Sequence, residues 1–80
     1  MHEPDIRWVR LRSDLGFVFY EGYALRYAKG GIEDTRVATV YPNDHYRKKY
    51  KVQILDRVPF HRRSVTSAKK DAETIYAATR

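Results

Sequence analysis

Aromatic side chains are interspersed among cationic ones in residues 45–51, which read HYRKKYK. Such a mixture is typical of surfaces that bind nucleic acids, because cations neutralise phosphates and flat rings stack on bases. Tyr50 opens an alternating apolar stretch and is expected in the core, whereas Tyr46 is expected in a loop. An ordinary solvated loop is the alternative for this segment. The nucleic-acid interpretation assigns base stacking or positioning to Tyr46 and phosphate contacts to Arg47, Lys48, Lys49 and Lys51.

Further cations surround the expected start of a C-terminal helix. A helix amino end offers free N–H groups and the positive end of the helix dipole, so cations around it would complete a clamp for phosphate. The dipole itself disfavours cations in the first turn. Their placement is therefore either incidental, on a plainly solvated surface, or it serves an anion. These candidate phosphate ligands are Arg62, Arg63, Lys69 and Lys70.

Residues 67–74, which read SAKKDAET, follow three expected strands. This layout resembles the βββα half of double-stranded-RNA-binding domains, in which lysines that open the last helix contact phosphates across a groove. The resemblance implies the same role for Lys69 and Lys70. The N-terminal helix of that family is not evident in this sequence. The layout also resembles the three-strand-plus-helix DNA-binding arms of some recombinases, so it is an analogy of architecture.

Positive charge is concentrated in one part of the chain. Residues 45–70 carry nine Lys or Arg and one acidic residue, a net charge of +8, whereas the whole chain of 80 residues has a net charge of +6. Residues 1–44 and residues 71–80 each have a net charge of −1. A basic face built from residues 45–70 would attract phosphate polymers or an acidic protein surface.

Other chemistries find little support. The chain has no cysteine, and the spacing of His2, His45 and His61 matches no metal site. Gly30-Gly31 lacks the further glycine and lysine of a phosphate-binding loop. A small metal-free ribonuclease is the alternative, with His45 or His61 beside arginines as the general base. No spacing in the sequence supports this role. We therefore expect no enzyme, no metal and no cofactor.

Two strand patterns predict a hairpin. Residues 23–29 and residues 36–41 both alternate, the second with Val37, Thr39 and Tyr41 on one face, and Gly30-Gly31 between them permits a reversal. Glu33-Asp34 is expected in the hairpin loop. Strong strand-forming residues also occupy residues 17–20, with an interruption expected at Glu21-Gly22.

The remaining segments predict strands and one helix. Residues 5–12 fit a strand or a helix, and their Trp, Val and Ile favour a strand. Residues 50–55 alternate as a further strand, and residues 58–60 are expected to be extended around their proline. The chain then becomes helical after a cap at Ser64 or Thr66. The expected apolar stripe of this helix is Val65, Ala68, Ala72, Ile75 and Thr79.

These elements predict an α+β fold in a single domain over residues 1–80, with a small antiparallel meander of three to four strands and one C-terminal helix packed on one face. The expected function is non-enzymatic, largely sequence-nonspecific binding of DNA or RNA through the basic face. The alternative is a protein-interaction module that regulates or inhibits a larger complex, of the kind encoded by phages and mobile elements. Its surface would use Trp8, Phe17, Phe19 and Tyr20.

Features that the sequence lacks lead to expectations about the location and the oligomeric state of the protein. No apolar run approaches the roughly 20 residues that span a bilayer, so we expect no membrane partner. The first residues are polar and carry no secretory signal, which favours a cytoplasmic location. A sheet this small has unpaired edges, so the chain is expected to be a monomer or a dimer formed through an edge strand.

Overall fold

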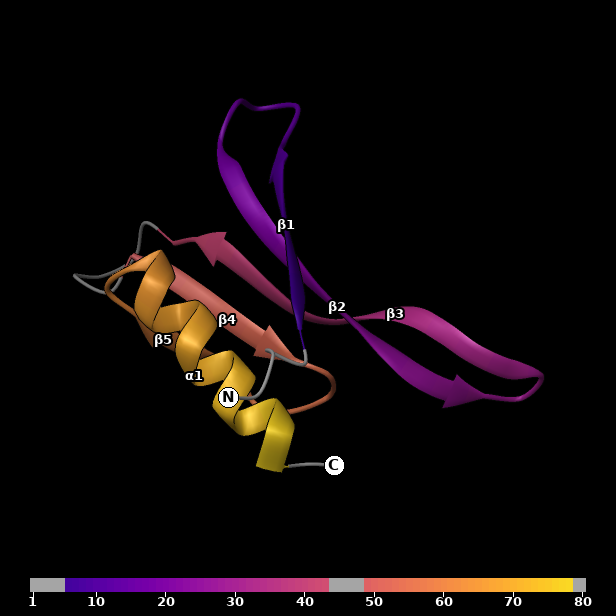
Figure 1. The fold of residues 1–80 in the computed structure, drawn as a ribbon. Coiled ribbons are helices and arrows are strands. Elements are labelled where there is room, and N and C mark those ends of the chain that lie inside the picture. The colour runs from indigo at the N-terminus through magenta and orange to yellow at the C-terminus, as the bar shows by residue number, and fades with distance from the viewer. Residues whose placement is uncertain (1–5, 44–48, 79–80) are drawn as a thin grey trace.

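The computed structural model describes residues 6–43 and 49–78, which form one antiparallel sheet and one helix (Figure 1). The strands lie side by side in chain order, and the helix packs on one face of the sheet (Figure 1). The elements are β1 (Arg7–Arg12), β2 (Val18–Ala28), β3 (Gly31–Pro42), β4 (Tyr50–Ile54), β5 (Phe60–Arg62) and α1 (Val65–Ala78).

The expected α+β meander with a C-terminal helix is confirmed, but the sheet has five strands instead of three or four. The additional strand β5 has only three residues, which is too short for an alternating pattern to reveal. It follows Pro59, whose ring holds the preceding residue in extended backbone. Residues 5–12 fitted a strand or a helix, and the structure has the strand β1 within them. Residues 17–20 and 23–29 correspond to the single strand β2.

The β2–β3 hairpin turns at Lys29-Gly30, because Ala28 pairs with Gly31 directly across the two strands. Both glycines of this turn have a positive φ, 106° for Gly30 and 141° for Gly31, which a side chain would disfavour. The predicted hairpin is therefore confirmed with a shorter loop. The placement of Glu33 and Asp34 in that loop was wrong, since both lie within β3.

A β-bulge interrupts the pairing of β2 with β3. Gly22 pairs with Ala38 and Tyr23 pairs with Arg36, so Val37 is left over on β3. Val37 and Ala38 are both buried, with 2% and 3% of their surface exposed, although they are consecutive in a strand. The prediction that Val37 shares a face with Thr39 was wrong for this reason. The interruption expected at Glu21-Gly22 is confirmed, and the extra residue lies on the partner strand.

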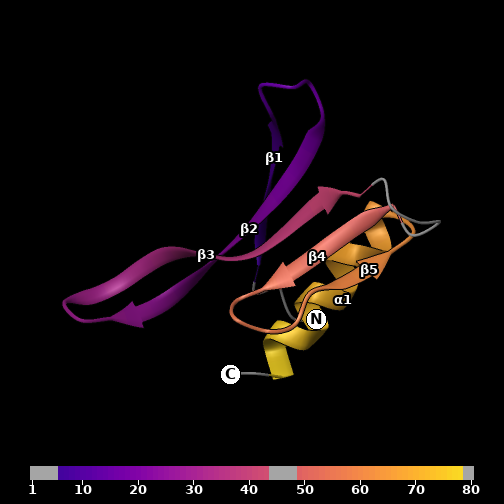
Figure 2. The same ribbon diagram turned by 180° about the vertical axis from the view of Figure 1, so that it is seen from behind.

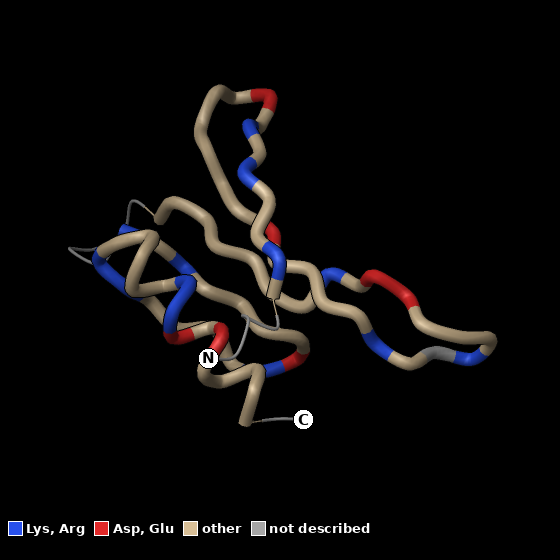
Figure 3. Tube along the Cα trace, in the orientation of Figure 1, with Lys and Arg blue, Asp and Glu red and all other residues tan. Residues whose placement is uncertain are grey.

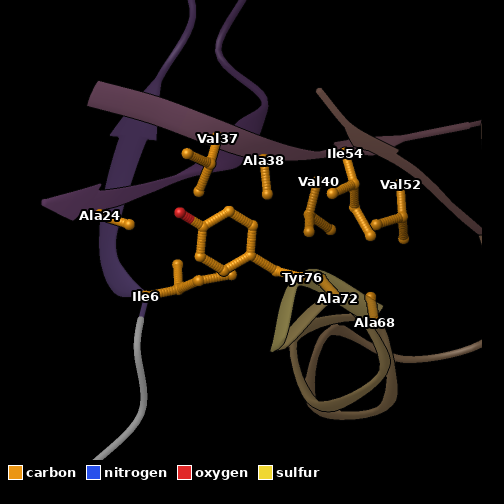
Figure 4. Close-up of a cluster of buried hydrophobic side chains, with 10 residues drawn as sticks. All are labelled: Ile6, Ala24, Val37, Ala38, Val40, Val52, Ile54, Ala68, Ala72 and Tyr76. Carbon is orange, nitrogen blue, oxygen red and sulfur yellow. The ribbon is translucent and has the colours of Figure 1, made fainter. Parts of the chain in front are cut away.

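The core lies between α1 and the sheet (Figure 4). Ala68 and Ala72 let the helix approach the strands closely, and Tyr76 extends its ring across the sheet toward Ile6 (Figure 4). Apart from Ile6, which directly precedes β1, the strands supply the other buried side chains, among which Val40 and Val52 are fully enclosed. The buried set is Ile6, Ala24, Val37, Ala38, Val40, Val52, Ile54, Ala68, Ala72 and Tyr76.

The amino end of α1 is capped by Ser64, one of the two residues expected there. The Ser64 Oγ atom accepts a hydrogen bond of 3.1 Å from the backbone N–H of Ser67. The predicted apolar stripe was right for Ala68, Ala72 and the half-buried Ile75, which packs against the core, but it omitted Tyr76, which is 5% exposed. Tyr76 follows Ala72 by four positions and so lies on the same side of the helix. Thr79 lies outside the described residues.

Both hairpins extend beyond the part of the sheet that α1 covers (Figures 1 and 2). The far end of the β2–β3 hairpin, residues 25–34, is called the arm. Its large side chains are exposed, with 72% of Leu25, 91% of Tyr27 and 59% of Ile32 open to solvent. The arm gives the molecule an elongated outline of 40 × 27 × 25 Å. Within residues 6–43 and 49–78, no helix has the length and apolar character to cross a membrane.

Candidate nucleic-acid interface

The two faces of the sheet differ in what covers them. Val52 and Ile54 of β4 are buried beneath α1, so Lys51 and Gln53, which alternate with them, lie on the opposite face. We call this opposite side the open face. In Figure 2 it is seen with β4 in front of α1, and none of the described helix residues covers it.

Antiparallel pairing gathers cations at one end of the molecule. Tyr50 at the start of β4 pairs with Arg62 at the end of β5, directly before α1 begins. Figure 3 shows the resulting concentration of Lys and Arg around these three ends, at a distance from the arm. We call this group the basic end. Its members that are exposed and have no ion-pair partner among the described residues are Lys49, Lys51, Arg63 and Lys70.

Arg62 is also at the basic end, but its side chain is held by neighbours. Its Nε donates a hydrogen bond of 2.5 Å to the Asp71 carboxylate on α1. The guanidinium carbon lies 4.5 Å from the centroid of the Phe60 ring, and one terminal nitrogen donates to the His61 carbonyl at 2.8 Å. Arg62 therefore joins β5 to α1 and keeps 34% of its side chain exposed toward solvent.

Lys69 is directed toward the β1–β2 hairpin. Its Nζ lies 4.2 Å from the centroid of the Tyr20 ring and 5.8 Å from that of Trp8. These cation–π contacts are worth about 0.5–1 kcal/mol at exposed sites, and they hold a cation that follows the first turn of α1, since the helix begins at Val65. The Trp8 Nε1 donates to the Glu73 carboxylate at 2.8 Å, which adds a second link between β1 and α1.

Of the other residues singled out in the sequence, Tyr50 and His61 lie in β4 and β5. Tyr46, Arg47 and Lys48 lie outside the described residues. Tyr50 is half-buried against the core, as its alternating pattern predicted. His61 pairs with Lys51 and shares the open face with it. In the part of the chain that the structure describes, no group of three or more His, Cys, Asp or Glu is placed to hold a metal ion.

A row of side chains crosses all five strands of the open face and was missed from the sequence. Leu11 pairs with Phe19, Tyr41 pairs with Lys51, and Lys51 pairs with His61. Phe19 and Tyr41 join the two halves of the row, because their rings stack with centroids 5.0 Å apart and an angle of 13° between planes. The row thus passes from apolar through aromatic to cationic groups. The alternation of residues 36–41 and 50–55 was visible in the sequence. Only the register of the strands shows that their outward side chains lie in one row.

A hollow of about 270 Å³ lies beside this row on the open face. The bulge creates it, because Val37 turns into the core at a position where regular alternation would place a side chain outward. Leu55 lines it with a φ of 48°, a strained value for this residue type. Its lining is Arg36, Val37, Ala38, Thr39, Tyr41, Gln53 and Leu55.

Glu21 lies next to the hollow, because it pairs across the sheet with Thr39, and its charge is neutralised. Arg36 donates a hydrogen bond of 2.8 Å to the Glu21 carboxylate, and the Tyr23 hydroxyl donates to the same carboxylate at 2.8 Å. The bond from Arg36, followed by that from Tyr23, holds the pKa of Glu21 below its ordinary value. The bond to Glu21 raises the pKa of Tyr23. Further along the face, Asp34 is paired with Arg7. The open face therefore presents little unbalanced negative charge.

Two more cations escaped the sequence analysis because residues 1–44 are acidic on average. Arg10 pairs across the sheet with Tyr20, whose ring contacts Lys69, so Arg10 lies on the α1 side of the β1–β2 hairpin. Arg12 follows two positions later on the same face and is likewise exposed. Their spacing of two residues within a strand was the feature of the sequence that could have placed both arginines on one face.

Comparisons with protein-family models, with curated proteins and with solved structures found no significant match to this chain. The function is therefore argued from the arrangement of its residues.

Proposed function

We propose that this protein binds nucleic acid without catalysing a reaction, through phosphate contacts made by the basic end. The observation that carries the proposal is the convergence of exposed cations that have no ion-pair partner among the described residues. They come from the start of β4 and the end of β5, which antiparallel pairing brings together, and from α1, which follows β5 in the chain. The proposed phosphate ligands are Lys49, Lys51, Arg63 and Lys70.

The neighbouring cations support this surface in different ways. Arg62 and Lys69 are fixed by Asp71 and by the Tyr20 ring, so they contribute positive potential from held positions. Tyr46, Arg47 and Lys48 belong to the proposed interface on the strength of the sequence alone. Phosphate contacts carry no sequence information by themselves, so binding through this end is largely sequence-nonspecific. A cytoplasmic location is part of the proposal.

A protein partner is the second candidate, and the exposed apolar side chains favour it. Leu25, Tyr27 and Ile32 on the arm form an apolar strip, since cross-strand pairing puts Tyr27 opposite Ile32. Such a strip is a feature of protein interfaces. Salt separates the candidates, because phosphate contacts weaken steeply with ionic strength and apolar contacts do not.

Charge reversal at the basic end tests the proposal. The double variant Arg63→Glu with Lys70→Glu alters two exposed cations and leaves the Arg62–Asp71 pair in place. We expect its affinity for a labelled oligonucleotide to fall about tenfold or more at about 50 mM salt, and its salt dependence to flatten by roughly 0.7–0.9 per lost phosphate contact. Fluorescence anisotropy at several salt concentrations measures both quantities.

The matched control reverses two exposed cations far from the basic end, Arg26→Glu with Arg57→Glu, and has the same net charge as the test variant. We expect it to bind nearly as well as the unmodified protein. Equal losses in both variants would mean that net charge alone causes the attraction. Undiminished binding by a folded Arg63→Glu, Lys70→Glu protein would show that the basic end is not part of the interface.

A further inference from the structure

We propose that the open face binds single-stranded nucleic acid, with one unpaired base seated in the hollow beside Tyr41 and the adjoining backbone running over Lys51 and His61. This inference rests on the proposed function and deepens it, because it names the form of nucleic acid and a site for bases. The basic end supplies phosphate contacts that any nucleic acid would use, whereas the open face is selective for bases whose faces and edges are free.

The hollow has the size and chemistry of a small binding pocket. Its volume of about 270 Å³ is close to the lower end of the range of roughly 300–1,000 Å³ for ligand pockets. Gln53 donates both N–H groups of its amide to the carbonyls of Leu55 and Arg57, which fixes the side chain and leaves its oxygen to accept. Thr39, whose side chain carries a hydroxyl, also lines the hollow. These groups suit the hydrogen-bonding edge of a base.

Tyr41 gives the hollow an aromatic wall. One side of its ring stacks on Phe19, and Phe19 in turn lies 6.1 Å from the Phe17 ring. The stack holds Tyr41 in position before any ligand arrives, so little side-chain freedom is lost on binding. A base in the hollow would lie against the Tyr41 side chain, which is one of its walls. Stacking on aromatic side chains tolerates every base, because each base has a π-face.

Charge on the open face matches a polyanion next to the aromatic wall. Lys51 lies directly across from Tyr41 and has no acidic partner among the described residues, and His61 continues the row with an imidazole, which can donate a hydrogen bond. Glu21, which pairs across the sheet with Thr39 of the hollow, is bound by Arg36 and Tyr23. A backbone leaving the hollow along the row would therefore meet donors and a cation and would then reach the basic end.

The absence of a covering element on the open face, among the described residues, favours single strands. In a duplex the base faces are stacked on neighbours and the edges are paired, so a base cannot enter a hollow in a sheet without being extruded. An unpaired strand can spread its bases on such a surface.

The experiment compares four fluorescein-labelled probes of about 15 nucleotides: single-stranded DNA, single-stranded RNA, the corresponding duplex, and a DNA strand with abasic sites throughout its centre. The abasic strand keeps every phosphate and lacks the bases. We expect both ordinary single strands to bind about tenfold more tightly than the abasic strand, since stacking is worth roughly 1–3 kcal/mol per base. The DNA and RNA arms show whether the 2′-hydroxyl matters.

Two variants locate the effect. Tyr41→Ala should lower affinity for the ordinary strands to that of the abasic strand and leave abasic binding unchanged. Thr39→Val keeps the branched shape that suits a strand and removes only the hydroxyl, so it should weaken base binding several-fold without disturbing the sheet. The matched control is Tyr27→Ala, which removes a tyrosine that is 91% exposed on the arm and should change nothing.

The outcomes separate this inference from the proposed function. Equal binding of ordinary and abasic strands, unaffected by Tyr41→Ala in a protein with an unchanged melting curve, would overturn the base site and leave phosphate binding intact. Tighter binding of the duplex than of the single strands would overturn it as well. A failure to bind any probe at about 50 mM salt would reject both proposals and favour a protein partner for the open face.

Discussion

Gly22 shows how one residue type determines the packing of β1 on β2. It pairs directly with Trp8, and a Cβ atom at this position would lie 2.5 Å from Ile6 Cγ2 and 3.0 Å from Trp8 Cζ3. Both neighbours pack on the core and Trp8 is also bonded to α1, so neither moves away freely. The absence of a side chain at Gly22 therefore permits the indole to lie flat across the strand.

Gly22→Ala should destabilise the fold by about 1–3 kcal/mol, the usual cost of overfilling a packed site. Urea denaturation followed by far-ultraviolet circular dichroism measures this change. In an Ile6→Ala background the atom nearest to the new methyl group is absent, so the same substitution should cost clearly less. An identical cost in both backgrounds would show that the clash is not the cause.

Glu21 should make stability depend on pH in a defined direction. Its pKa in the folded protein lies below its ordinary value of 4.5, chiefly because of the bond from Arg36. Between these two pKa values the unfolded chain binds more protons than the folded one, so the free energy of unfolding rises with pH. The contribution is complete above the ordinary value and is lost as pH falls through the folded-state pKa.

Glu21→Gln tests this direction, because glutamine has no charge to gain or lose. The variant should be less stable than the unmodified protein near pH 7, and the difference should shrink toward about pH 3. Denaturation midpoints at both pH values give the comparison, and the remaining carboxyl groups titrate equally in the two proteins. A difference that stays constant with pH would mean that the Glu21 charge contributes nothing.

At the scale of elements, α1 illustrates what local patterns can and cannot provide. Its cap at Ser64 and its small residues Ala68 and Ala72 were visible in the sequence, because they act within the helix itself. Tyr76 was not assigned to the core, since tyrosine is amphipathic and only the position of Ile6 across the sheet decides that its ring is enclosed.

The strands give the same lesson about register. Alternation predicted the β2–β3 hairpin, but it did not predict the bulge that buries Val37 beside Ala38 and leaves a hollow on the other face. A bulge changes which residues share a face, and one extra residue carries no compositional signal. The row from Leu11 to His61 depends on three cross-strand pairings and one ring stack, so no single segment contains it.

The positions of the cations were also predictable only in part. Their concentration in residues 45–70 was apparent from composition, and this predicted one basic end. Which of them are held and which are free depends on partners far away in the chain, as with Lys69 over the Tyr20 ring. Arg10 and Arg12 were hidden because an average over residues 1–44 cancels them against acids that lie elsewhere.

At the scale of the whole molecule, burial is divided unequally between the helix-covered part and the arm. Every buried side chain belongs to the former, among the residues that the structure describes, and Ala24 is the last one along β2. The arm is attached beyond the core by Ala24 and Thr35, which pair directly across the hairpin. Its one ion pair to the rest of the molecule among these residues is exposed, between Arg7 and Asp34. Such pairs contribute about 0–1 kcal/mol.

The arm should therefore be dispensable for folding. Replacing residues 25–34 by Asn-Gly joins Ala24 to Thr35 through a two-residue turn that suits a hairpin. The replacement removes two cations and two acids, so net charge is unchanged. We expect a cooperative melt within about 5 °C of the original, since exposed side chains and one surface ion pair contribute about 1 kcal/mol or less. Oligonucleotide affinity should also be preserved, because the basic end and the open-face row remain. A large loss of affinity with an unchanged melt would instead make the arm part of the interface, whereas a lost melt would show that its strands stabilise the sheet through pairing alone.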